Sequence, residues 1–342
     1  MIRMLIKQYH QKEYLVLFGF LLILLTACQD DKLDIPDTGR KITINGLITT
    51  DKLLNVRISK SAYLTDESSS EQVSLYSIDN AQVLIYQNNN VIDSLYFNEP
   101  WFDISFYDNL YQNGNYVSKY LFPITGKEYK VIAKVPGMPE ASSITTIPDL
   151  VRIERLDTSR IIVANQFSKT NLCLKCNIEF TDPANETNYY LFNIYKNYKE
   201  FGSMNSDNMG FLCNDPIVEE KLIGHIGSAL SGDPIRGIAY TDKLINGQKS
   251  DLTVTISCTD IGLPFWIDDP NYNGDGNHRK VIYFRLYSIT EEYFKYIQTL
   301  NKYNKDYDNP LAKPELVYSN VTGGYGIFAG AEVSSDSIVF TY

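Results

Sequence analysis

Histidine is nearly absent from this chain, with three occurrences among 342 residues. Histidine is the commonest metal ligand and a frequent general base, so zinc sites built from histidines and Ser-His-Asp triads have little material here. His225 lies in Ile223-Gly224-His225-Ile226-Gly227, which contains no G-x-S-x-G or H-E-x-x-H motif. We therefore expect His225 to be a loop or strand histidine and not a catalytic base. A carboxylate pair of the glycosidase type stays open, because the separation that it requires is spatial.

Long apolar runs are also missing, because none reaches the ~20 residues that a membrane-spanning helix needs. The run at residues 14–25 follows three basic residues and leads into Leu25-Thr26-Ala27-Cys28. A positive start, a short apolar run and a small-residue cleavage site make up a signal peptide, and a cysteine directly after them resembles the bacterial lipobox. We expect residues 1–27 to be removed and Cys28 to carry covalent lipid, palmitate included. A single-pass anchor in which Cys28 is incidental is the alternative.

Positive charge is in deficit, since 31 Lys and Arg oppose 41 Asp and Glu for a net charge of −10. Such a surface repels nucleic-acid phosphates and anionic lipid headgroups. We therefore expect no nucleic-acid partner. We also expect more than one acyl chain to hold the protein in membrane lipid, because a single chain binds only marginally.

Residues 28–38 have the polar composition of a tether. The acidic pair Asp30-Asp31 beside Cys28 resembles the short export signal that sends lipoproteins of Bacteroidota to the outer face of the outer membrane. We therefore expect a lipid-anchored protein of the outer membrane that faces the cell surface. A solvated linker that carries no address is the alternative.

Cysteine is scarce after Cys28, and four positions remain: Cys173, Cys176, Cys213 and Cys258. The alternation in residues 172–180 predicts a half-buried strand, in which three residues span ~10 Å. A disulfide needs Cα atoms within ~7 Å, so Cys173 and Cys176 are not expected to bond each other. No second C-x-x-C supports a zinc site. Structural thiols and a disulfide to Cys213 or Cys258 are the alternatives.

The first half of the chain consists of short alternating runs separated by turn residues, which indicates a β-sandwich. Asn88-Asn89-Asn90 lies between two such runs, where a hairpin turn is expected. Residues 136–148 contain prolines and a glycine, and we interpret them as an inter-domain connection. We thus expect an N-terminal domain over residues 39–148 and a C-terminal domain over residues 149–342. The clearest runs are residues 42–46, 56–58, 83–86, 91–96 and 131–133.

The second half is again mostly β, with one exception at residues 290–303. There Tyr293, Ile297 and Leu300 recur at helical spacing after Ser288-Ile289-Thr290-Glu291, which has the form of a capping box. We expect an all-β protein of two sandwich-like domains, the second with one helix packed on its sheet. Strands are predicted at residues 172–180, 189–195, 251–257, 281–287 and 337–342.

One loop copies the opening of a calcium site, with oxygen donors at positions one, three and five and glycine at six. Position twelve is Lys280 instead of the bidentate glutamate, and position two is proline. An exposed loop rich in turn residues accounts for the same letters and is favoured. The calcium ligands in the alternative interpretation are Asp269, Asn271, Asn273 and Asp275.

The chain has 26 tyrosines, most of which we expect to be structural, since tyrosine is an ordinary strand residue. Dense aromatic clusters are candidates for a recognition surface that stacks on sugars or anchors peptides. The candidates are Trp101, Phe102, Phe106, Tyr107, Phe265 and Trp266.

Four glycines near the C-terminus, Gly323, Gly324, Gly326 and Gly330, are expected to allow positive φ and close approach of backbones. A phosphate-binding loop is disfavoured, because no Lys-Ser or Lys-Thr follows.

Several motifs together resemble the Bacteroidota lipoproteins grouped as domain of unknown function 4249. The resemblance covers nearly the whole chain after Cys28. It implies a transthyretin-like or carboxypeptidase-regulatory-like sandwich in the first half. It also implies an envelope lipoprotein often encoded beside TonB-dependent transporters, and it implies no reaction. The motifs are Asp182-Pro183, Asn188-Tyr189-Tyr190, Thr241-Asp242-Lys243-Leu244-Ile245-Asn246-Gly247-Gln248, Leu286-Tyr287-Ser288-Ile289-Thr290-Glu291-Glu292-Tyr293 and Tyr318-Ser319-Asn320-Val321-Thr322-Gly323-Gly324-Tyr325-Gly326-Ile327-Phe328-Ala329-Gly330.

Three functions from different classes follow from these observations. We expect a non-enzymatic accessory or ligand-capturing subunit of a TonB-dependent nutrient transporter, because tethering raises its concentration near an integral partner. An anchored hydrolase of glycan or peptide polymers is the first alternative, and a structural scaffold of the envelope is the second.

Overall fold

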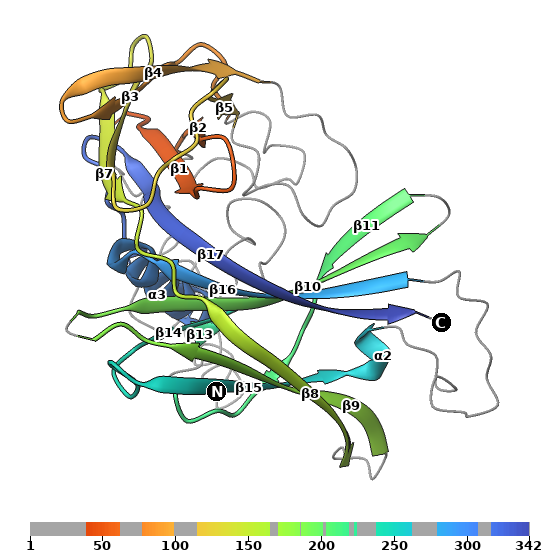
Figure 1. Cartoon of the computed structure of the whole chain (residues 1–342). Coiled ribbons are helices and arrows are strands. Elements are labelled where there is room, and N and C mark those ends of the chain that lie inside the picture. Colours follow the sequence, from red (N-terminus) through yellow and green to blue (C-terminus); the bar gives the residue numbers. More distant parts are fainter. Residues whose placement is uncertain are drawn as a thin grey trace, which may run out of the picture. The chain divides into compact units, whose positions relative to one another are not determined.

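The computed structural model describes residues 39–61, 77–98, 115–164, 170–184, 186–200, 203–218, 222–223, 237–261, 279–306 and 316–341. All of these except Gly39 belong to a unit that spans Arg40–Tyr342. Strands dominate this unit (Figure 1), so the mainly β fold class is confirmed.

Short strands in the first half of the chain surround one hydrophobic core. Because side chains alternate along a strand, Ile42 and Ile44 in one strand and Val83 and Ile85 in another are completely buried, whereas the residues between them are not. The strands are β1 (Ile42–Ile48), β2 (Asn55–Lys60), β3 (Gln82–Gln87), β4 (Asn90–Phe97), β5 (Tyr116–Val117), β6 (Glu128–Lys134) and β7 (Ala141–Thr146).

The hairpin turn between β3 and β4 is confirmed. Asn88 and Asn89 have φ values of 49° and 64°, and they are the two residues between the strands. A two-residue turn with both φ values positive matches the twist of the flanking strands, and asparagine tolerates this conformation better than most residues.

Residues 136–148 contain strand β7, where we expected only an inter-domain connection. Its buried positions are Ala141, Ser143 and Thr145, and it pairs with β6 in antiparallel fashion. Small and hydroxyl-bearing residues line the buried side, so the alternation does not appear as an apolar pattern. Ser143 Oγ donates a hydrogen bond of 3.0 Å to the carbonyl of Asn320, which explains how its hydroxyl is accommodated.

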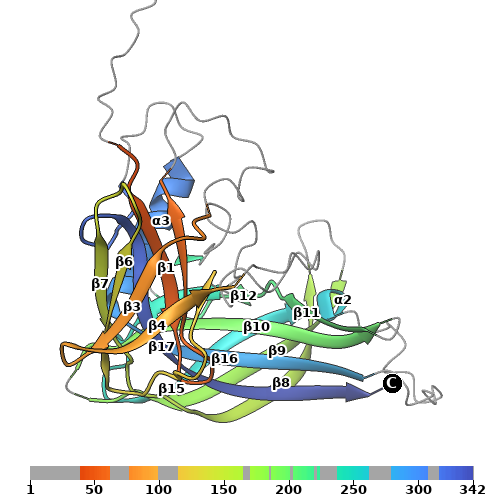
Figure 2. The same ribbon diagram turned by 90° about the horizontal axis from the view of Figure 1, so that it is seen from above.

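The second half of the chain forms two layers with a core between them. One layer is an antiparallel sheet in the order β12-β15-β9-β8, and the other includes β14, β10 and β16 (Figure 1); the view from above in Figure 2 superposes the strands of the two layers. Ile178 and Val254 from the first layer share the core with Phe192 and Phe284 from the second. The elements are β8 (Ile153–Ala164), β9 (Thr170–Thr181), β10 (Tyr189–Glu200), β11 (Ser203–Asn208), β12 (Leu212–Cys213), β13 (Leu222–Ile223), β14 (Gly237–Thr241), β15 (Lys249–Ser257), α2 (Cys258–Ile261), β16 (Arg279–Ile289), α3 (Glu291–Asp306) and β17 (Tyr325–Thr341).

Strand β17 joins the two halves, as the long dark-blue arrow in Figure 1 shows. Its first part pairs with β1 in parallel, from Tyr325 to Gly330, and its second part pairs with β16 in antiparallel fashion, from Ala331 onward. The mixed sheet therefore runs β13-β14-β10-β16-β17-β1-β2-β5-β4-β3-β6-β7, with β11 paired to β10. The hydrophobic core changes between Ile147 and Val151, where we placed a domain boundary, and that boundary stays a prediction.

The glycines that lead into β17 allow backbones to approach closely, as expected. Gly323 and Gly326 have φ values of 76° and 108°, and a Cβ atom at Gly326 would collide with the carbonyl oxygen of Ile44 in β1. A side chain at Gly330 would likewise collide with the carbonyl oxygen of Thr146.

The predicted helix is confirmed as α3, and Tyr293, Ile297 and Leu300 all lie in its buried face. The capping-box prediction is wrong. Ser288 belongs to β16, where its Oγ accepts a hydrogen bond of 3.2 Å from the Val151 amide. Glu291 pairs at 2.9 Å with Lys295, one turn along the helix. The serine hydroxyl thus attaches the start of the C-terminal half to β16 and does not cap the helix.

Candidate functional site

Most residues that the sequence singled out for function lie outside the described residues, and the roles predicted for them stay predictions. They are Cys28, the aromatic residues Trp101, Phe102, Phe106, Tyr107, Phe265 and Trp266, and the calcium-loop residues Asp269, Asn271, Asn273 and Asp275.

The four cysteines after Cys28 are present as buried thiols. Burial, followed by the proximity of Cys258, raises the pKa of Cys176 to about 12, so its thiolate is scarce at neutral pH. Cys213 and Cys176 both lie opposite Val254, one from each neighbouring strand. Two strand spacings are ~9.5 Å, too far for a disulfide between Cys213 and Cys176. In this structure no disulfide joins these four residues, and a disulfide of Cys173 with Cys213, or of Cys173 or Cys176 with Cys258, stays a prediction.

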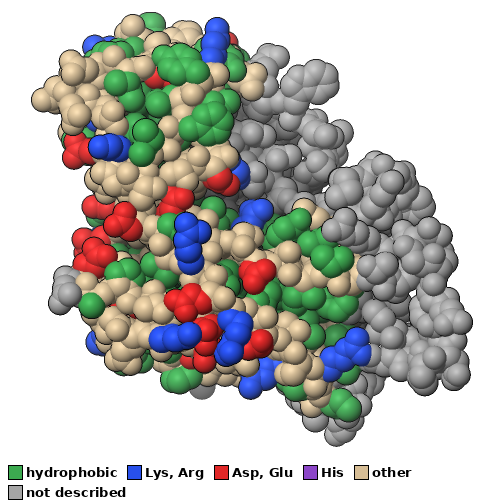
Figure 3. Space-filling view, in the orientation of Figure 1, with side chains coloured by type: hydrophobic (Ala, Val, Ile, Leu, Met, Phe, Trp, Pro, Cys, Tyr) green, Lys and Arg blue, Asp and Glu red, His purple; other side chains and the backbone are tan. Residues whose placement is uncertain are grey.

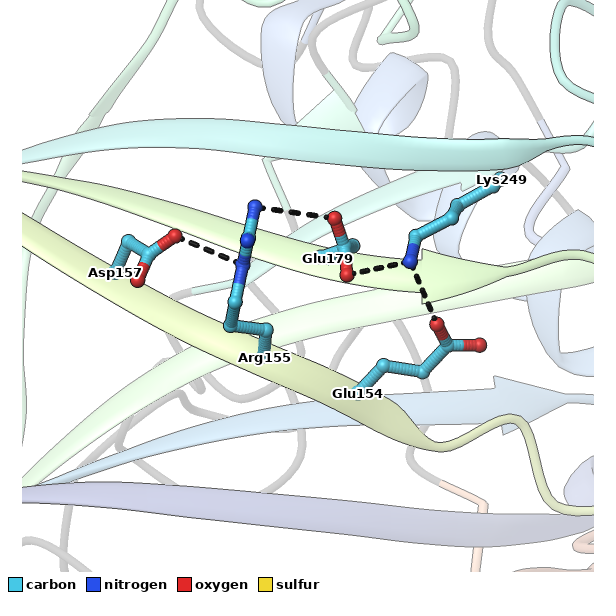
Figure 4. Close-up of polar contacts among 5 residues, drawn as sticks. All are labelled: Glu154, Arg155, Asp157, Glu179 and Lys249. Carbon is cyan, nitrogen blue, oxygen red and sulfur yellow. Dashed lines mark hydrogen bonds and ion pairs between the residues drawn. The ribbon is translucent and has the colours of Figure 1, made fainter.

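A network of charged side chains covers the outer face of the β8-β9-β15 sheet (Figure 4). Lys249 Nζ lies 2.7 Å from Glu179 and 3.3 Å from Glu154, and Arg155 lies 3.2 Å from Glu179 and 2.9 Å from Asp157. An irregularity in the β8–β9 register between Ile153 and Arg155 indicates a bulge, which explains why adjacent residues of β8 reach the same network. Figure 3 shows interspersed charges over these strands. The face is therefore solvated, and each exposed pair contributes at most ~1 kcal/mol.

Three of the motifs that carry the family resemblance form a buried clamp between loops. Asp182 is 2% exposed and accepts hydrogen bonds from the Tyr190 hydroxyl and, at 2.9 Å, from the Gly247 amide. Asp242 accepts a bond of 2.9 Å from the Asn188 amide. Burial raises the pKa of Asp182 above its ordinary value, although the bonds from Tyr190 and Gly247 oppose this increase. The motif residues here hold the chain together.

Asn320, which belongs to another of these motifs, also has a structural role. Its Nδ2 donates a bond of 2.7 Å to the Phe328 carbonyl, and its Oδ1 accepts a bond of 3.0 Å from the Phe328 amide. The side chain thus imitates a neighbouring strand for β17. Four of the family's motifs therefore contain residues with a structural role.

A small cavity lies between the β1–β2 connection and the sheet that contains β10 and β16. Strand alternation points Tyr190, Phe192 and Ile194 into the core between the two layers and therefore turns Asn193 and Tyr195 to the opposite face. The volume of the cavity is about 50 Å³, enough for a few water molecules or a group of a few atoms. The lining residues are Leu47, Ile48, Thr49, Lys52, Leu53, Asn55, Leu191, Asn193, Tyr195 and Tyr287.

Asn193 is the polar centre of this cavity and is 1% exposed. Its Nδ2 donates a bond of 3.3 Å to the Tyr195 hydroxyl, whereas its Oδ1 has no hydrogen-bond partner among the described residues. A buried acceptor without a partner costs ~1–3 kcal/mol. Among the residues that line the cavity, Asn193 is thus the one whose buried polar atom has no partner in the described structure.

Arg285 supplies a positive charge beside the cavity. Its guanidinium lies 4.6 Å from the centre of the Tyr195 ring, a distance at which a cation is attracted to the ring face. Burial lowers the pKa of Arg285, but Tyr287, Tyr195 and Asp51 together raise it above its ordinary value. Arg285 therefore remains protonated, and a second cationic residue, Lys52, lines the cavity itself.

Sequence reasoning did not select Asn193, Tyr195 or Tyr287. The strand at residues 189–195 was predicted, and an asparagine inside an otherwise apolar and aromatic strand was the one available signal. The opposing lining residues, Leu47 to Asn55, are more than 130 positions earlier in the sequence, so no local pattern connects the two sides.

The described part of the chain contains no group of three His, Cys, Asp or Glu side chains that could hold a metal ion. Within the same residues, no helix has the length and apolar character needed to cross a membrane. The lining of the cavity itself supplies polar side chains such as Asn193 and aromatic side chains such as Tyr195 and Tyr287.

Comparisons with known proteins place this geometry in a family context. The family described as "Domain of unknown function (DUF4249)" matches residues 30–337. No curated protein matches the sequence. A solved structure titled "Biofilm associated protein - BSP domain" is similar at 9% identity and a TM-score of 0.17, over 87% of this chain and 58% of that chain. A TM-score this low supports no inference about fold or function.

Proposed function

We propose, from the premise that the chain belongs to the family of domain of unknown function 4249, that it captures a ligand without catalysis at the outer membrane. In this proposal Cys28 carries the lipid anchor, and the protein faces the cell surface as an accessory subunit of a TonB-dependent nutrient transporter. The motif resemblance to Bacteroidota lipoproteins and the sequence around Cys28 support the anchor and the address.

The observation that carries the capture role is the cavity with its unpartnered Asn193 Oδ1. Binding sites combine apolar and aromatic walls with a few placed polar groups, and Leu47, Leu191 and Tyr287 provide such walls around the amide. The cavity is smaller than a typical ligand pocket of ~300–1,000 Å³. It therefore suits the end of a larger ligand that otherwise lies outside it.

The proposed lipid anchor explains why weak binding of the ligand is sufficient. A module anchored beside an integral partner reaches an effective concentration of about a millimolar, so weak contacts with ligand and transporter are occupied. The negative net charge of −10 disfavours anionic membrane surfaces, which leaves the acyl anchor to provide membrane attachment.

The test is a pull-down from native outer membranes in mild detergent, with a C-terminal tag on the chain and mass spectrometry as the readout. Stoichiometric recovery of a TonB-dependent transporter, lost in Cys28→Ala, is the expected result. Recovery of the protein without a transporter contradicts a stable accessory subunit. Recovery of other envelope proteins in place of a transporter favours the scaffold, and turnover on a glycan or peptide panel favours the hydrolase.

A further inference from the structure

Asn193 contrasts with Glu332, whose two carboxylate oxygens both accept hydrogen bonds, because half of the Asn193 amide is unused. Glu332, also buried, accepts a hydrogen bond of 2.5 Å from Thr50 and one of 3.3 Å from Thr125. Asn193, which lines the cavity, makes one bond, to Tyr195, and its Oδ1 is buried without a partner in the described structure. A polar atom enclosed in this way is stabilised by any group that enters and donates a hydrogen bond to it.

We infer that the cavity receives a hydroxyl group at the end of a neutral sugar or related polyol, with Asn193 Oδ1 as the acceptor. This inference rests on the proposed capture function and names its ligand class. Tyr195 and Tyr287 line the cavity as aromatic neighbours for the carbon atoms that carry the hydroxyl.

The charge distribution selects the hydroxyl over other polar groups. A carboxylate or phosphate group, when fully ionised, only accepts hydrogen bonds and does not satisfy Asn193 Oδ1. An ammonium group donates, but it enters beside the cations of Lys52 and Arg285 and is repelled. A hydroxyl group donates to the amide and at the same time accepts from a cationic neighbour.

The size of the cavity agrees with a terminal group. About 50 Å³ accommodates a few non-hydrogen atoms, such as a hydroxymethyl arm, but not a sugar ring. The ring would remain outside the cavity. The inference therefore predicts recognition of the hydroxyl-bearing end and tolerance toward the rest of the ligand.

The experiment measures calorimetric binding of a panel of neutral mono- and oligosaccharides to the full acylated protein. The detergent must lack a sugar headgroup. The panel includes matched deoxy sugars, uronic acids and amino sugars. We expect a neutral sugar to bind and its matched deoxy form to bind at least tenfold more weakly.

Three variants locate the binding. Asn193→Leu is expected to lose at least tenfold in affinity, because the acceptor is gone. Asn193→Asp is expected to keep measurable affinity, because it retains an acceptor. Tyr240→Phe is the matched control, since it removes another buried hydroxyl for which the described residues provide no partner, in the core away from the cavity. It should bind like the wild type.

Each remaining outcome has a definite meaning. Equal affinity of wild type and Asn193→Leu overturns the site, as does an Asn193→Asp variant that folds normally and does not bind. Binding of a uronic acid or amino sugar in preference, with dependence on Asn193, overturns the hydroxyl class but leaves capture intact. A panel without binding overturns the inference even if the pull-down recovers a transporter. Sugar binding without transporter recovery leaves the inference standing and removes the transporter partner.

Discussion

Two polar positions in or beside β10 are both buried but are treated differently by the fold. Asp182 directly follows β9 and accepts hydrogen bonds from Gly247 and from Tyr190, near the start of β10. Asn193, within β10, keeps an oxygen without a partner in the described structure. Asp182 and Tyr190 are in the motifs that carry the family resemblance, whereas Asn193 is in none of them. Asp182, whose hydrogen bonds are made within the chain, holds the chain together. Asn193, whose oxygen has no partner in the described structure, is where we look for binding.

The largest effect is expected from Asp182→Ala. The substitution leaves the Tyr190 hydroxyl and the Gly247 amide without their acceptor in a buried loop. Each buried orphan donor costs ~1–3 kcal/mol, so the free energy of unfolding should fall by ~3 kcal/mol or more in urea titrations. A loss below ~1 kcal/mol would show that the clamp does not hold the loops.

Tyr190→Phe should have the next largest effect. It removes the donor to Asp182 and leaves one buried carboxylate oxygen without that bond, while the ring keeps its packing against Phe180. A loss of ~1–3 kcal/mol in the free energy of unfolding is expected. If the double variant with Asp182→Ala loses as much as the two single variants combined, the two residues are not coupled as described.

The pH dependence of stability tests the same clamp. Burial raises the pKa of Asp182 in the folded state. For an acid of this kind the stabilising contribution is present below the pKa of the unfolded chain, ~3.9, and is lost as pH rises through the folded pKa. The stability of the wild type relative to Asp182→Asn should therefore decrease from about pH 3 toward neutrality, as measured by urea unfolding at several pH values. An increase over that range would contradict a raised pKa.

The smallest effect is expected at the unsatisfied site. Asn193→Leu exchanges a buried, half-bonded amide for an apolar side chain of similar size, so the free energy of unfolding should stay within ~1 kcal/mol of wild type or rise. Tyr240→Phe should behave similarly for the same reason. If the free energy of unfolding falls by several kcal/mol in Asn193→Leu but not in Tyr240→Phe, Asn193 has a structural role like that of Asp182.

Local patterns predicted much of the fold. Alternation located β1, β3, β9 and β15, helical spacing located α3, and two asparagines located the β3–β4 turn. The patterns failed where hydroxyl-bearing side chains are buried, because such side chains do not appear as part of an apolar pattern. Strand β7 buries Ser143 and Thr145, and Ser288 bonds to Val151 in place of capping a helix. Hydroxyl groups satisfy distant backbone groups in both cases, and a local pattern does not contain the distant partner.

Local patterns in the sequence were enough to indicate the mainly β class, the helix, the close backbone contacts at the glycines of β17 and the family to which the chain belongs. These depend on side-chain periodicity and backbone conformation within a few residues. Tertiary structure alone decided that β17 pairs with both β1 and β16, and that the residues around Leu47 and Asn55 meet Asn193 and Tyr287. Those contacts depend on the register between segments that are not neighbours in the sequence, and β1 and β17, like the two sides of the cavity, are more than 100 residues apart. The free energy of packing selects that register, and no local signal specifies it.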